Sequence, residues 1–158
     1  IETSYTSFFF TIFAIILLIG VIYYVRNKSI RITKNVIRIK GKDKKVQFKV
    51  ILHLQNYTSK AIHNLKVIDL IPHLIKHYSD FGTLEPTHIQ QGNKGLRFIW
   101  EINKIESGEE MVISYMIEPQ LHTFGKIGLP SASLQFTGTN NRLVIRRSNA
   151  ASFEVRKQ

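Results

Sequence analysis

Hydrophobic residues follow two different patterns along the chain, one continuous and one alternating. The run from Phe8 to Val25, FFFTIFAIILLIGVIYYV, has no charged residue and a single clearly polar one, Thr11. As a helix it would span roughly 27 Å at about 1.5 Å per residue, close to the hydrocarbon thickness of a bilayer. Because every face of this helix would be apolar, the run predicts a transmembrane helix and not the amphipathic helix of a soluble core.

Beyond this run, apolar and polar residues alternate with a period of two, which is typical of half-buried β-strands. The apolar positions are Val46, Phe48, Val50, Leu52 and Leu54 in one segment and Leu96, Phe98, Trp100 and Ile102 in another, with shorter segments at 65–68, 111–117, 132–136, 143–145 and 153–155. Turn residues separate the segments, as in a sandwich of antiparallel sheets. We expect six side chains to be largely buried in this sandwich: Phe48, Val50, Leu52, Trp100, Tyr115 and Phe136.

Three stretches are less regular. Within residues 30–40 the apolar positions change phase, which predicts a bulge or break near Lys34 and Asn35. The segment from Pro72 to Tyr78 fits one helical turn or a loop, and the polar segment from Glu85 to Lys94 fits a connection. The predicted organisation is a transmembrane helix with its flanks at 1–28 and an all-β, antiparallel sandwich at 29–158.

Charge is distributed unevenly about the apolar run. The net charge is +11, only Glu2 precedes the run, and Asp43 is the sole acid in residues 26–45. The basic residues after the run are Arg26, Lys28, Arg31, Lys34, Arg38, Lys40, Lys42, Lys44 and Lys45. By the positive-inside rule this asymmetry predicts a cytoplasmic C-terminal domain. The alternative is the cell surface.

This basic strip also predicts binding to anionic lipid headgroups, at about 1 kcal/mol for each residue near the surface. Nucleic-acid binding by a membrane-tethered domain is the other interpretation. Exposed aromatic residues do not interleave with the basic ones, and no nucleic-acid motif is present, so specific recognition of nucleic acid is not expected.

Three segments together resemble a known family. They are VQFKVILHLQNYTSKAIHNLKVIDLIP, FIWEINKIESGEEMVISYMIEP and GLPSASLQF, which lie between about residues 44 and 137. In this order they resemble the conserved-repeat immunoglobulin-like domains of archaeal and bacterial surface-layer and adhesin-type proteins. The positions that match the family's motifs are Asn56, Thr58, Asp69, Pro72, Trp100, Gly108, Tyr115 and Pro130.

The resemblance implies an immunoglobulin-like sandwich used as a spacer or adhesive module, usually outside the cell. The chain departs from the family in having its apolar run before the domain and a basic flank behind that run. The matching residues have structural interpretations. Asp69 can accept backbone N–H groups and close a turn. Trp100 can anchor the core, and Gly108 permits a backbone conformation that other residues resist.

Candidate chemistry is sparse. The chain has no cysteine, which excludes disulfides, thiolate metal sites and cysteine nucleophiles. His73 and His77 would share one face of a helix, but neither Glu85 nor His88 completes a recognisable metal spacing. We therefore expect no cofactor, no metal and no catalytic residue. The sequence instead predicts a non-catalytic interaction module with a lipid bilayer around residues 8–25 and an unidentified protein partner.

Two segments fit the N-glycosylation acceptor pattern. They are Asn56-Tyr57-Thr58 and Asn27-Lys28-Ser29. A domain outside a glycosylating cell could carry a glycan at Asn56, whereas a cytoplasmic domain could not.

Overall fold

The structure is a computed structural model that describes residues 5–26, 29–40, 46–119, 125–138 and 141–155. In these residues one helix, α1 (Tyr5–Arg26), is followed by β-strands alone. The strands are β1 (Ile30–Lys40), β2 (Val46–Asn56), β3 (Ile62–Pro72), β4 (Ile75–Ser79), β5 (His88–Gly92), β6 (Gly95–Ile105), β7 (Glu110–Pro119), β8 (Gly125–Leu129), β9 (Ser133–Thr137), β10 (Leu143–Arg147) and β11 (Ala151–Val155).

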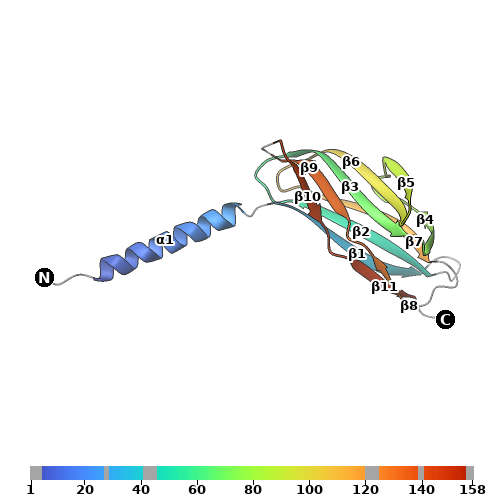
Figure 1. The fold of residues 1–158 in the computed structure, drawn as a ribbon, viewed down its shortest axis with the longest axis horizontal. Coiled ribbons are helices and arrows are strands. Elements are labelled where there is room, and N and C mark those ends of the chain that lie inside the picture. The colour runs from blue at the N-terminus through green and yellow to red at the C-terminus, as the bar shows by residue number, and fades with distance from the viewer. Residues whose placement is uncertain (1–4, 27–28, 41–45, 120–124, 139–140, 156–158) are drawn as a thin grey trace.

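The strands form two main sheets and one small one. The first sheet has the order β1-β2-β7-β4, the second β10-β9-β3-β6-β5, and β11 pairs with β8. Every pairing is antiparallel. The two larger sheets face each other as a sandwich, and α1 extends away from the end of the sandwich at which β1 begins (Figure 1). The all-β, antiparallel, sandwich-like architecture expected from the alternating pattern is therefore confirmed.

The core lies between the sheets and is centred on aromatic side chains. Trp100 and Phe98 from β6 meet Tyr115 from β7, with ring centroids 5.1 Å apart for Phe98 and Tyr115 and 6.1 Å apart for Trp100 and Tyr115. These three side chains are fully buried, as are Val50 and Leu52 from β2. Phe48 is also buried, whereas Phe136 is only partly buried against the core. Five of the six expected core residues are confirmed by burial.

The predicted bulge near Lys34 is wrong. β1 pairs with β2 without a register shift from Ile30 opposite Asn56 to Lys40 opposite Val46. The apolar phase changes because Lys34 occupies an inward position where an apolar residue was expected, and its side chain is fully buried. Ile37 lies on the outer face of the sheet and is 47% exposed.

The predictions for two connecting segments are also corrected. β3 continues to Pro72, a two-residue turn follows, and β4 begins at Ile75, so no helical turn forms. The polar segment 85–94 contains β5, which pairs antiparallel with β6 at the edge of the second sheet. The side chains of β5 are mostly exposed. Without a buried face the strand needs no apolar alternation, and this is why the sequence pattern did not reveal it.

Candidate functional site

The helix α1 presents apolar side chains to its surroundings over its whole described length. All side chains from 7 to 23 are exposed, including Phe10 at 72% and Leu18 at 59%. Within the helix, the Thr11 hydroxyl donates a hydrogen bond to the Ser7 carbonyl at 2.8 Å. Contiguous exposed apolar surfaces of this extent mark protein-interaction or membrane-interaction sites.

Within the part of the chain that the structure describes, no helix combines the length and the hydropathy required to cross a membrane.

The basic strip does not form one surface. Arg31 and Arg38 are exposed on β1, but Lys34 between them is fully buried. Lys40 ends the strand, and ten residues of strand at about 3.3 Å each place it roughly 33 Å from Ile30. Arg26 ends α1, while Lys28, Lys42, Lys44 and Lys45 lie outside the described residues. The predicted role of Lys34 at the membrane surface is therefore wrong.

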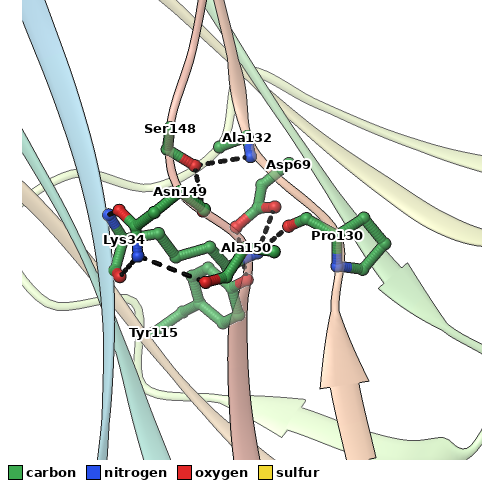
Figure 2. Close-up of polar contacts among 8 residues, drawn as sticks. All are labelled: Lys34, Asp69, Tyr115, Pro130, Ala132, Ser148, Asn149 and Ala150. Atoms are coloured by element: carbon green, nitrogen blue, oxygen red, sulfur yellow. Dashed lines mark hydrogen bonds and ion pairs between the residues drawn. The ribbon is translucent and has the colours of Figure 1, made fainter.

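Lys34 instead belongs to a buried polar cluster that joins the two sheets (Figure 2). Its Nζ donates to Asp69 Oδ1 at 2.6 Å and to the Pro130 carbonyl at 3.0 Å. The hydroxyl of Tyr115 donates to Asp69 Oδ2 at 2.8 Å. Lys34, Asp69 and Tyr115 are all fully buried. Because both ions are desolvated, each needs the other, and loss of one partner would leave an unpaired buried charge.

The cluster is removed from water, and this disfavours the charged forms of its side chains. Burial raises the pKa of the Asp69 carboxyl above its ordinary value, although Lys34 and hydrogen bonds from Lys34, Tyr115 and the Leu70 backbone oppose this change. Burial, the charge of Asp69 and the hydrogen bond to Asp69 together raise the pKa of Tyr115 well above its ordinary value. Tyr115 is therefore a neutral hydrogen-bond donor over the whole physiological pH range.

The segment between β10 and β11 fixes the backbone of Lys34 from the side. Lys34 N–H donates to Asn149 Oδ1 at 2.9 Å, and Asn149 Nδ2 donates to the Lys34 carbonyl at 2.7 Å. Ser148 Oγ accepts from the Ala132 N–H at 2.9 Å (Figure 2). The side-chain amide of Asn149 thus makes the two backbone hydrogen bonds that a neighbouring strand would otherwise make at this position of β1. These bonds stabilise the strand at the residue whose side chain is buried.

A second buried polar group closes the end of the sandwich nearest α1. Asn56 Nδ2 donates to the carbonyls of Lys60, Ile105 and Glu106, and its Oδ1 accepts from the Thr58 N–H and hydroxyl. Gly108, at φ 75°, donates its N–H to the Asn56 carbonyl. Because Asn56 is fully buried with its amide in use, it does not present a free glycan acceptor. Asn27 lies outside the described residues.

The remaining motif residues have structural positions. Trp100 Nε1 donates to the Leu84 carbonyl at 3.1 Å from within the core, and Pro72 ends β3. Asp69, expected to close a turn, chiefly binds Lys34 and Tyr115.

The two histidines do not share a helix face. His73 lies in the turn after β3, with its ring nitrogen 3.0 Å from the Asn93 carbonyl, and His77 lies in β4. Among the described residues, no three His, Cys, Asp or Glu side chains gather closely enough to hold a metal ion.

Two arrangements of charged residues, one buried and one exposed, were not predicted from the sequence. The first is the Lys34–Asp69 pair. Its only signal in the sequence is that Lys34 follows Ile30 and Ile32 at the two-residue spacing of inward-facing positions. The second feature is a group of exposed arginines on and beside β10, namely Arg142, Arg146 and Arg147. The available signal was the absence of any Asp or Glu between residues 119 and 153.

Comparisons with known proteins give only distant structural likenesses. No protein-family model matches the chain, and no curated protein matches it. An exo-β-N-acetylglucosaminidase from Vibrio harveyi aligns over 77% of this chain and 18% of its own length, at 10% identity and a TM-score of 0.48. The Fcho1 mu homology domain of Danio rerio, solved with an Eps15 peptide, aligns over 82% of this chain and 48% of its own, at 10% identity and a TM-score of 0.45.

The yeast delta-COP-I mu-homology domain aligns over 77% of this chain and 53% of its own length, at 12% identity and a TM-score of 0.40. The chain thus spans at most about half the length of these three neighbours. At such identities and scores the likenesses transfer neither activity nor partners. The chain is assigned to no family, and its own surfaces are the basis for a function.

Proposed function

We propose that the chain is a membrane-anchored, non-catalytic interaction module in which α1 inserts into a bilayer and the sandwich presents its surfaces to a protein partner. The observation that carries the proposal is the exposed, uncharged apolar surface of α1, which projects from a domain with a complete core of its own. Residues 5–25 contain no charge, and Tyr23 and Tyr24 stand near the end of the helix, where aromatic rings favour the headgroup region.

The sandwich itself has the features of a structural module. Its buried Lys34, Asp69, Tyr115 and Asn56 all have hydrogen-bond partners. In the described part of the chain, no buried side-chain nitrogen or oxygen lacks a partner. Polar groups held in complete networks rigidify a core and specify one arrangement of it. This supports a binding or spacing role of the kind implied by the immunoglobulin-like resemblance.

The experiment that tests the anchor is alkaline carbonate extraction of membranes from cells that express the full chain. We expect the chain to remain with the membranes. A variant with Ile15→Lys and Leu18→Lys should be extracted, because each charge at a helix centre costs about 2.5–3.5 kcal/mol on insertion. A matched control with Ile37→Lys and Val112→Lys, two exposed positions on the sandwich, should remain in the membranes.

Extraction of the unaltered chain would refute the anchor. Fluorescence of Trp100, the only tryptophan, shows whether the sandwich is still folded in each variant. Release of a folded double variant would then report on α1 and not on misfolding.

We further infer that the sandwich faces the cytoplasm. The positive-inside rule acts on the chain during insertion, before the fold forms, so Lys34 counts toward it even though the folded domain buries this residue. Protease added to intact cells should leave the segment after Val25 undigested. Digestion without lysis would place the sandwich on the cell surface.

The alternative, in which the entire basic strip binds anionic lipid or nucleic acid, has less support. Such a surface would need its charges on one face, but Lys34 is buried. The exposed Arg31 and Arg38 are seven residues apart on β1, and this odd spacing puts their side chains on opposite faces of the strand.

A further inference from the structure

The edge strand β10 and the residue before it carry a mixed basic and apolar surface. We call this the β10 surface, and it consists of Arg142, Leu143, Ile145, Arg146 and Arg147. All five residues are exposed, with Leu143 at 65% and Ile145 at 49%. Because side chains alternate along a strand, Leu143, Ile145 and Arg147 share one face of β10 and Arg146 lies on the other, so these residues share the edge of the sheet and not a single face. Exposed apolar side chains rimmed by polar residues mark interaction sites where they form a contiguous patch.

The surroundings of the β10 surface contain little negative charge. No Asp or Glu occurs between residues 119 and 153. Across the sheet from Ile145 stand Gln135 and then Lys66. The next residue across the sheet is an acid, Glu101, whose Oε1 lies 3.4 Å from Lys66 Nζ. Its charge is therefore paired with that of Lys66. The β10 surface therefore complements an anionic partner that also accepts apolar groups.

The position of the β10 surface suggests which partner this is. Three residues separate the end of α1 from the start of β1, and β10 lies beside β1 (Figure 1). The end of β9 and the start of β10 lie at the end of the sandwich that α1 joins. A bilayer that holds α1 would therefore lie next to this edge.

Acidic residues also lie at this end of the sandwich, but farther from β10. Glu106, Glu109 and Glu110 lie between β6 and β7 or at the start of β7. In the sheet that contains β10, β9 and β3 separate β10 from β6, whereas β2 alone separates β7 from β1. At the β1 side, the guanidinium of Arg31 lies 5.4 Å from the centre of the Tyr57 ring. Charge thus favours a tilt that brings β10 toward an anionic membrane and turns the β6–β7 connection away from it.

We propose that the β10 surface binds anionic lipid headgroups and holds the sandwich against the membrane in one orientation. This inference rests on the proposed function, because α1 supplies the membrane. The three arginines attract the headgroups, and Leu143 and Ile145 insert at the boundary between headgroups and acyl chains. The anchored domain is thereby fixed with β5, the opposite edge of the same sheet, directed away from the bilayer.

The test uses the full chain in lipid nanodiscs, with one polarity-sensitive label per molecule. Because the chain has no cysteine, Ile145→Cys and Ile89→Cys each provide a single labelling position. Ile89 is the matched control, since it is 43% exposed on β5. We compare discs of phosphatidylcholine alone with discs that also contain phosphatidylserine.

In the anionic discs, the label at 145 should shift to a less polar environment and be quenched by a headgroup-attached quencher, whereas the label at 89 should not respond. Replacing Arg142, Arg146 and Arg147 by Gln should reduce the preference for anionic over neutral discs by about a hundredfold, at roughly fivefold for each charge. Salt at about 1 M, where the Debye length is near 3 Å, should have a similar effect.

Equal responses at 145 and 89 in chains that have entered the discs would overturn the inference about β10 and leave the anchor in place. Failure of the chain to enter the discs would overturn both. Single-stranded RNA added to neutral discs provides the remaining comparison. A larger response at 145 to RNA than to anionic lipid would show that the surface binds nucleic acid, and the lipid inference would be wrong.

Discussion

Lys34 and Arg38 lie four residues apart on the same strand, yet they have opposite environments. Lys34 is fully buried and donates to Asp69 and to the Pro130 carbonyl. Arg38 is exposed. Both belong to one basic run in the sequence, and both have an even number in a strand of period two. Lys34 has a buried carboxylate to bind, that of Asp69. Arg38 instead stands opposite Phe48, a buried apolar side chain that cannot pair with a charge.

This comparison shows that a run of like charges need not be a single surface. An ion enters a core only where a partner and hydrogen bonds offset its desolvation, which costs several kcal/mol for each ion. Lys34 meets this condition through contacts to β3 and to the segment before β9, neither of which is near it in sequence. Substitutions at the two residues should therefore have very different effects on the stability of the fold.

The first prediction is that Lys34→Met lowers the free energy of unfolding by about 3–5 kcal/mol, because it leaves Asp69 buried without its cation. Denaturant unfolding of the detergent-solubilised full chain, followed by Trp100 fluorescence, measures the effect. A loss below about 1 kcal/mol would mean that the pair does not stabilise the fold and that Lys34 resembles Arg38 after all.

The second prediction tests whether the two partners act as a unit. Adding Asp69→Asn to Lys34→Met should restore about 1–3 kcal/mol, because the unpaired charge is removed while an oxygen remains for the Tyr115 hydroxyl. The same unfolding measurement on both single variants and on the double variant gives the coupling. Simple additivity of the two losses would contradict a direct interaction between Lys34 and Asp69.

The third prediction concerns pH. The folded-state pKa of Tyr115 is raised well above 10.0, so above pH 10 the unfolded chain loses this proton and the folded chain keeps it. Stability from this group is complete below pH 10 and is lost as the pH rises, by up to about 1.4 kcal/mol per pH unit. Unfolding free energies of the unaltered chain and of Tyr115→Phe, measured between pH 8 and about 11, should therefore converge at the alkaline end. Parallel curves would show that Tyr115 ionises equally in both states.

The fourth prediction concerns the backbone of Lys34. Asn149→Ala removes both hydrogen bonds between the Asn149 amide and the main chain of Lys34. We expect a loss of about 1 kcal/mol, since Asn149 is itself exposed and water can replace part of what is lost. Faster hydrogen exchange at the Lys34 amide is the specific readout, and unchanged exchange there would show that Asn149 does not protect the strand.

The fifth prediction is that Arg38→Gln changes the free energy of unfolding by less than about 0.5 kcal/mol, as is usual for exposed positions without special contacts. The same fluorescence assay applies. A loss comparable to that of Lys34→Met would remove the contrast between the two residues.

Local patterns predicted much of the fold. The alternation in β2, β6 and β7 predicted these strands and the burial of Trp100 and Tyr115, because a strand with one buried face must repeat its apolar residues every second position. The polar strand β5 escaped detection because an exposed edge strand places no such requirement on its side chains. Backbone pairing with β6 across a two-residue turn determined it, and this pairing leaves no trace in the alternation of side chains.

Candidate surfaces depended more strongly on contacts between distant segments. The uncharged apolar run, the excess of basic residues after it and the absence of acids around β10 can all be read from the sequence. The folded arrangement alone places Lys34 in the core, and it puts Arg142, Arg146 and Arg147 on or beside a strand that contacts β1. The physical reason is that composition counts charges, whereas burial and cross-sheet partners decide which of them face solvent. Those partners come from contacts between residues as far apart in the sequence as Lys34 and Asn149.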